Sequence, residues 1–228
     1  MKEVVVISLG GSIIVPDKIH TQLLEKFRKV LNSNRNKYKF VVVCGGGSVA
    51  RKYISSLREI GKSIFLQSMA GIAVTRMNAR FMTYFFGKDA SWGIPHDMKQ
   101  IKNLLLKNDV VFCGALRYEK NNTSDGTAAK IASFLKANFI NMTNVKGLYD
   151  KNPLAHKNAK FIPEEKWDSF MKRANKIKFE AGQHYVLDQN AAKIIKEHKI
   201  KTFIIGDSMV NLDNLLIGRK FTGTVIEG

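Results

Sequence analysis

The sequence predicts an α/β fold: a three-layer αβα sandwich around a mainly parallel sheet. Short apolar segments alternate with helical stripes along all 228 residues, which is typical of a parallel sheet covered on both faces. Two of these segments run directly into glycine-rich turns, Gly10-Gly11-Ser12 and Gly45-Gly46-Gly47-Ser48. No Pro/Gly/Ser-rich linker, internal repeat or low-complexity tract interrupts the pattern, so we expect a single domain over residues 1–228.

Each expected strand is a brief, largely β-branched apolar run bounded by polar or turn-forming residues. The strands are expected at Val4–Leu9, Phe40–Cys44, Val110–Cys113, Phe139–Met142, Lys201–Ile205 and Thr222–Ile226. Each expected helix follows apolar residues three and four positions apart. The helices are expected at Thr21–Asn32, Val49–Ile60, Met69–Phe86, Met98–Leu106, Thr127–Leu135, Glu164–Arg173 and Ala191–His198.

The two glycine-rich turns are the first candidate functional elements. A glycine turn between a strand and a helix leaves backbone N–H groups bare and lets a ligand approach without a Cβ in the way. The positive end of the helix dipole faces the same point, which suits a phosphate. A tight βα turn without a ligand is the alternative for either segment alone. The segments match neither a G-x-x-x-x-G-K-[ST] loop nor a G-x-G-x-x-G fingerprint.

Composition narrows the classes of protein further. Lys and Arg exceed Asp and Glu by 18, but the lysines are scattered over predicted solvated helix faces. No nucleic-acid-binding motif accompanies them, so we expect no specific nucleic-acid partner.

The cysteines and histidines do not indicate a metal site. Both cysteines end predicted buried strands, and the five histidines lack metal-ligand spacing. With no signal peptide after Met1 and no membrane-spanning run, a cytoplasmic protein without a membrane partner is expected.

A third candidate follows the strand Val110–Cys113. Thr123, Ser124 and Asp125 stand before a predicted helix, and a helix N-cap is the plain interpretation. Hydroxyls and a carboxylate near bound phosphates also suit phosphoryl transfer, which needs alignment and charge neutralisation more than covalent chemistry. Further along, Tyr149 lies in a turn-rich segment where a purine could stack.

The order of these motifs resembles the amino-acid-kinase superfamily and, within it, the archaeal type of uridylate (UMP) kinase. The resemblance covers essentially the whole chain. It is carried by Gly10-Gly11-Ser12, Gly45-Gly46-Gly47 with Arg51-Lys52-Tyr53, Gly71-Ile72 with Thr75-Arg76, Thr123-Ser124-Asp125, and Thr143-Asn144-Val145 with Gly147 and Tyr149.

The resemblance implies transfer of the γ-phosphoryl group of ATP, with Mg²⁺ carried by the nucleotide, to UMP in pyrimidine nucleotide biosynthesis. It implies ATP-binding roles for Gly11, Ser12, Gly47, Arg51, Thr143, Asn144, Tyr149 and Asn152. It implies UMP-binding roles for Gly46, Ser68, Leu116, Arg117, Tyr118, Asn121, Asn122, Thr123 and Ser124. Asp125 would be the catalytic carboxylate, acting as an electrostatic organiser. The N-terminal half would hold the acceptor and phosphates, residues from about 137 to 228 would hold ATP, and the assembly would be a homohexamer built as a trimer of dimers.

Several positions depart from the family pattern. Ser8 stands where bacterial relatives have a phosphate-binding lysine, Ser68 stands where an aspartate is common, and Lys146 and Asn152 replace two aspartates. The loop before Asp125 is also about two residues longer than in close relatives. An isopentenyl phosphate kinase, or another small-molecule kinase of the same fold, is therefore the alternative; a non-catalytic nucleotide- or nucleic-acid-binding protein is a third hypothesis.

Overall fold

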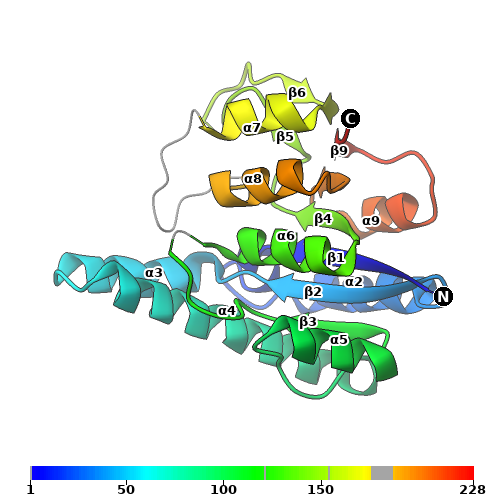
Figure 1. Cartoon of the computed structure of the whole chain (residues 1–228), viewed down its shortest axis with the longest axis horizontal. Coiled ribbons are helices and arrows are strands. Elements are labelled where there is room, and N and C mark those ends of the chain that lie inside the picture. Colours follow the sequence, from blue (N-terminus) through cyan, green and yellow to red (C-terminus); the bar gives the residue numbers. More distant parts are fainter. Residues whose placement is uncertain (1, 121, 154, 176–186) are drawn as a thin grey trace.

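A computed structural model describes residues 2–120, 122–153, 155–175 and 187–228 of the chain (Figure 1). Its main sheet has seven strands in the order β3-β2-β1-β4-β8-β9-β7. In chain order these strands are β1 (Glu3–Leu9), β2 (Tyr38–Cys44), β3 (Val110–Cys113), β4 (Asn138–Met142), β7 (Glu164–Glu165), β8 (Thr202–Ile205) and β9 (Gly223–Ile226). A separate hairpin joins β5 (Leu148–Tyr149) to β6 (Phe161–Ile162).

The pairing of the strands is mainly parallel, as predicted. Strand β1 lies between β2 and β4, with Ser8 opposite Val43 on one side and Asn141 on the other. The pairs β2–β3 and β4–β8 continue this parallel arrangement, whereas β9 runs antiparallel to β8. The carboxyl ends of β1, β2, β3 and β4 therefore meet at one edge of the sheet, which is where open α/β sheets bind ligands.

Helices cover both faces of the sheet and complete the predicted three layers. The helices are α1 (Gly11–Ile14), α2 (Thr21–Asn34), α3 (Gly47–Glu59), α4 (Ile64–Phe86), η1 (Gly87–Asp89), α5 (Met98–Lys107), α6 (Ser124–Leu135), α7 (Trp167–Asn175), α8 (Gln189–Glu197) and α9 (Met209–Leu216). One apolar core joins the sheet to α5, α6, α7 and α8, and a second joins it to α1, α2, α4 and α9. Helices α3 and α4 run side by side beyond the sheet (Figure 1). None of the described helices is long and apolar enough to cross a membrane.

The helix predicted at Glu164–Arg173 is wrong at its start. Glu164 and Glu165 form β7, and α7 begins only at Trp167. The backbone carbonyls of Pro163 and Glu165 accept hydrogen bonds from Val225 and Glu227, at 2.8 and 3.2 Å. Pairing with β9 therefore takes the backbone groups that the first helical turn would have used.

Other helices start earlier than predicted or were not predicted, and capping side chains set their observed starts. Helix α4 starts at Ile64 rather than Met69, since the Ser63 hydroxyl accepts a hydrogen bond from the Leu66 N–H at 3.4 Å. Helix α9, which was not predicted, is capped in the same way by Ser208. Helix α6 starts at Ser124 rather than Thr127, and its cap is Thr123, one of the three capping candidates.

Candidate active site

The two glycine-rich segments meet backbone to backbone at the carboxyl edge of the sheet. A Cβ added to Gly11 would lie 2.1 Å from the Gly47 nitrogen and 2.5 Å from the Gly46 carbonyl carbon, so no side chain fits there. Gly47 also has φ +63°, a conformation that favours glycine. The predicted phosphate-binding residues Gly11, Gly46 and Gly47 are thus brought together by direct contact.

Hydrogen bonds fix these segments to neighbouring strands. The Gly10 N–H donates to the Met142 carbonyl at 3.2 Å, and the Gly45 N–H donates to the Leu9 carbonyl at 2.9 Å. The buried Asn78 side chain, from α4, donates to the Gly45 carbonyl at 2.7 Å. Because the cap of α3 is Gly46, which offers no side-chain oxygen, the first N–H groups of this helix can receive an anion.

Asp125 lies in the first turn of α6 and approaches the last residues of β1. The Ser8 hydroxyl donates a hydrogen bond to Asp125 Oδ1 at 2.6 Å. Ser8 is only 1% exposed, and Asp125 is partly buried. The sequence indicated the Asp125 carboxylate but not its partner, Ser8. The available signal for Ser8 was its position as a lone polar residue within the apolar run Val4–Leu9.

The charge state of Asp125 is set by its surroundings. Burial, and secondarily the charge of Asp188, raises the pKa of Asp125 to about 7. The hydrogen bond from Ser8 acts in the opposite direction. A carboxyl group whose pKa is shifted to near neutral by burial and by a second carboxylate is a candidate functional group.

A polar network links the start of α6 to the start of α8. The Thr123 hydroxyl donates to Asp188, and its oxygen accepts from the Gly126 N–H at 3.2 Å. Asp188 in turn caps α8 by accepting from the Ala191 N–H at 2.9 Å. Asn190 donates to the Asn122 side chain at 2.9 Å. Asp188 and Asn190 were missed as site residues, although an aspartate before Ala191 carries a capping signal.

The loop between β3 and α6, residues 114–123, is held at its start by α4. The Ala115 N–H donates to the Thr75 hydroxyl at 3.0 Å, while Arg76 donates to the carbonyls of Ala115, at 3.0 Å, and Leu116. Farther out, the rings of Phe65 and Tyr118 meet edge to face, with centroids 4.9 Å apart. This β3–α6 loop and α4 therefore form two walls beside the glycine segments.

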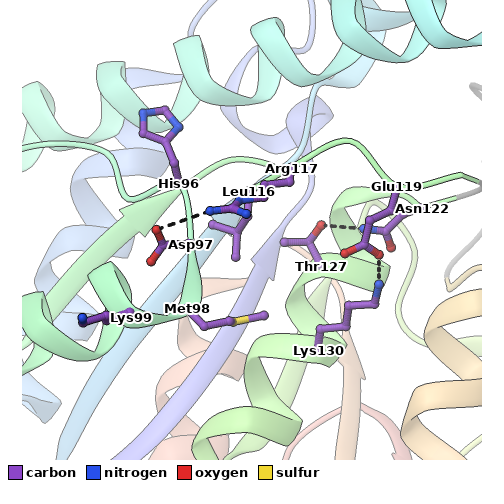
Figure 2. Close-up of a pocket in the computed structure, with 10 residues that line it drawn as sticks. All are labelled: His96, Asp97, Met98, Lys99, Leu116, Arg117, Glu119, Asn122, Thr127 and Lys130. Carbon is purple, nitrogen blue, oxygen red and sulfur yellow. Dashed lines mark hydrogen bonds and ion pairs between the residues drawn. The ribbon is translucent and has the colours of Figure 1, made fainter.

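A cavity of about 340 Å³ lies on the other side of the loop, between α5 and α6 (Figure 2). Leu116, Arg117 and Asn122 line it, together with charged residues that already pair with one another. Arg117 lies 3.8 Å from Asp97, and Lys130 pairs with Glu119. The cavity lining does not include Asp125 or the glycine segments.

The residues predicted to bind UMP therefore divide between different places. Leu116, Arg117 and Asn122 line the cavity between α5 and α6. Thr123 and Ser124 lie beside Asp125 at the start of α6. Ser68 is partly buried on α4, Tyr118 is in the β3–α6 loop, and Asn121 lies outside the described residues.

The residues predicted to bind ATP lie on several separate segments. Ser12 is in α1 and Arg51 is in α3, both next to the glycine contact. Thr143 follows β4, donates its N–H to the Ile205 carbonyl at 3.0 Å, and precedes the exposed Asn144. The Tyr149 ring is on the β5–β6 hairpin, 5.5 Å from that of Phe161. Asn152 is exposed beyond this hairpin.

Cysteine chemistry has no place in this site. Cys44 and Cys113 are free and buried, and burial raises the pKa of Cys113 to about 12, so its thiolate is scarce at neutral pH. Across the described residues, no three His, Cys, Asp or Glu side chains form a group that could hold a metal ion.

Comparison with known proteins defines the family. Residues 3–206 match the family described as the amino acid kinase family. The chain belongs to the amino acid kinase family. It is 32% identical over 225 residues to the uridylate kinase of Methanothermobacter thermautotrophicus, covering 98% of this chain and 99% of that one.

Solved structures agree with this assignment. The uridylate kinase of Archaeoglobus fulgidus is 34% identical, with a TM-score of 0.85 over 99% of this chain and 100% of that one. The UMP kinase of Ureaplasma parvum is 18% identical, with a TM-score of 0.82 and full coverage of both chains, and this likeness concerns the fold alone. The resemblance to archaeal uridylate kinases is confirmed.

The glycine contact leads to a first prediction for this family member. Gly11→Ala places a methyl group against the Gly47 backbone, so we expect the segments to separate and ATP binding to fall below detection in equilibrium dialysis. Gly71→Ala, in α4, is the matched control, because its Cβ would meet only the side chain of Ile54 from α3, whose flexible end lies 3.2 Å away. Normal ATP binding by Gly11→Ala would contradict the packing described.

A second prediction concerns stability and pH. Folding raises the pKa of Asp125 from 3.8 to about 7. The protonated Asp125 side chain therefore contributes to the stability of the fold below pH 4, and this contribution is lost as the pH rises to about 7. Asp125→Asn removes the cost of ionising this group. After allowance for partial exposure, we expect the substitution to raise the free energy of unfolding at pH 8 by about 2 kcal/mol, which corresponds to an increase in Tm of roughly 4–8 °C. The gain should vanish near pH 4.

The control is Asp207→Asn, which changes an exposed carboxylate. Calorimetry at pH 4, 6 and 8 compares the two variants with the wild type. An Asp125→Asn protein no more stable than wild type at pH 8 would show that Asp125 ionises at no cost to the fold.

Proposed function

We propose that this protein is a uridylate kinase, which transfers the γ-phosphoryl group of ATP to UMP and gives UDP and ADP. The observation that carries the proposal is the contact of Gly11 with Gly46 and Gly47, beside a carboxylate at the start of α6. Such a site supplies backbone N–H groups for phosphates and a fixed charge near the transferring group. The full-length similarity to archaeal uridylate kinases supports UMP as the acceptor.

The two substrates approach from opposite sides of the glycine contact. In the proposed arrangement Gly46, Ser68 and the β3–α6 loop hold UMP, so the N-terminal half provides the acceptor site. Gly11, Ser12, Gly47 and Arg51 hold the ATP phosphates, and residues from about 137 to 228 hold the adenosine through Thr143, Asn144, Tyr149 and Asn152. The Arg51 guanidinium suits bidentate binding of phosphate oxygens.

The reaction needs no general base. A UMP phosphate oxygen forms the new bond to the γ-phosphorus, the bond to the β–γ bridging oxygen breaks, and ADP leaves. The attacking phosphate oxygen is already ionised near neutral pH, so Asp125 orients the groups rather than removing a proton. Mg²⁺ enters on the ATP phosphates and neutralises the charge that develops there, and no residue of this chain is assigned to it.

Self-association belongs to the same proposal. Apolar side chains are exposed along the α3–α4 pair, where Tyr53 is 58% and Met77 is 70% exposed. An apolar surface shared by two helices is suited to packing on a second copy. We propose a homohexamer assembled as a trimer of dimers, in the cytoplasm, where two buried free cysteines persist.

A panel of acceptors tests the activity. With Mg-ATP and UMP, CMP, dUMP, AMP or isopentenyl phosphate, UMP should give the largest kcat/KM, measured by coupled detection of ADP. Enzyme without acceptor controls for ATP hydrolysis. Isopentenyl phosphate performing as well as UMP would favour the alternative kinase of the same fold.

Sedimentation velocity tests the assembly. The wild type should sediment as six copies of the 25.7 kDa chain, and Met77→Lys should lower that mass by placing a charge on the exposed face of α4. Val210→Lys is the matched control, because Val210 is 73% exposed on α9 instead. A wild-type monomer at micromolar concentration would rule out the hexamer.

A further inference from the structure

Ser8 has no role in the proposed chemistry, yet it is among the most deeply buried polar residues near the site. Strand β1 alternates its side chains between two cores: Val6 packs with the α6 side and Ile7 with the α2 side. Ser8 therefore projects on the same face as Val6, toward α6. A hydroxyl that is 1% exposed needs a partner, and that partner is Asp125, at 2.6 Å.

The surroundings of Asp125 make this hydrogen bond consequential. The nearby negative charge is that of Asp188 at the start of α8. The glycine segments carry no titratable side chain, β1 contributes Ser8, and β4 contributes the buried amide of Asn141 opposite it. The Arg51 guanidinium belongs to α3, beyond Gly47. Among these groups, the Ser8 hydroxyl is a direct donor to the carboxylate.

We propose that Ser8 is a positioning residue of the reaction centre, whose hydroxyl fixes the Asp125 carboxylate and favours its ionised form. This inference deepens the proposed function, because it concerns how the same site stays charged. Charge-assisted O–H···O⁻ bonds are short and strong. The hydroxyl belongs to β1, an interior strand between β2 and β4, so the sheet itself holds the donor in place.

The test is the pH profile of kcat in Ser8→Ala. Loss of one donor to a carboxylate should move the acidic limb of the profile upward by about one pH unit. At pH values below the limb, kcat should fall about tenfold relative to wild type, while at pH 9 it should return close to the wild-type value. The KM for ATP should change little. A uniform loss of kcat at every pH would mean that Ser8 only supports packing, and would overturn the proposal.

Three further variants make the result specific. Asp125→Asn should abolish the limb, which assigns it to Asp125. Ser8→Thr keeps the hydroxyl and should keep the limb at its wild-type pH. Ser91→Ala removes another fully buried hydroxyl, beside the start of β3 and therefore at the opposite edge of the sheet, and should leave the profile unchanged.

A substrate-free measurement separates this inference from the proposed function. Carboxyl ¹³C NMR titration of the apo protein, with Asp125 assigned through Asp125→Asn, reads the carboxyl directly. Ser8→Ala should raise the Asp125 midpoint by about one pH unit whether or not UMP is the acceptor. Equal midpoints in wild type and Ser8→Ala overturn the role of Ser8, even if UMP kinase activity is found. A raised midpoint without UMP kinase activity overturns only the proposed function.

Discussion

The contact between the backbones of Gly11, Gly46 and Gly47 is the constraint on which the site depends. It sets how closely α1 and α3 approach, and so where the bare N–H groups at the start of α3 lie. Hydrogen bonds to Leu9, Met142 and Asn78 tie the same segments to the sheet and to α4. An anion bound there would meet backbone N–H groups that the sheet, α1, α3 and α4 already hold in place, which would lower the entropic cost of binding.

The order of the strands explains why distant segments share this site. Because β1 lies between β2 and β4, its carboxyl end adjoins both halves of the chain. Ser8 on β1, Asp125 on α6 and Asp188 before α8 then form one polar row across the sheet edge. Burial and the charge of Asp188 oppose the ionisation of Asp125 in this row, and the hydrogen bond from Ser8 favours it.

The sequence predicted the layers, the main parallel strands and the two glycine-rich turns, because these depend on periodicity and on local residue type; the backbone contact between the turns was found only in the structure. It failed where a long-range partner decided the outcome. Glu164 and Glu165 became a strand because β9 pairs with them, and nothing local signals that pairing. The hydrogen-bond partner of Ser8 is Asp125, which lies 117 positions away in the chain. The early start of α4 was a different error, since Ser63 is a local cap that could have been recognised.

Hydrogen bonds hold the β3–α6 loop at both of its ends. Thr75 and Arg76 hold its first residues, while Asn122 and Thr123 are tied to α8. Between these anchors, Arg117 and Glu119 form ion pairs with Asp97 and Lys130 at the surface, so this middle part could lengthen without displacing Asp125. A longer middle segment would reshape the cavity between α5 and α6 and would leave the contact of Gly11 with Gly46 and Gly47 where it is.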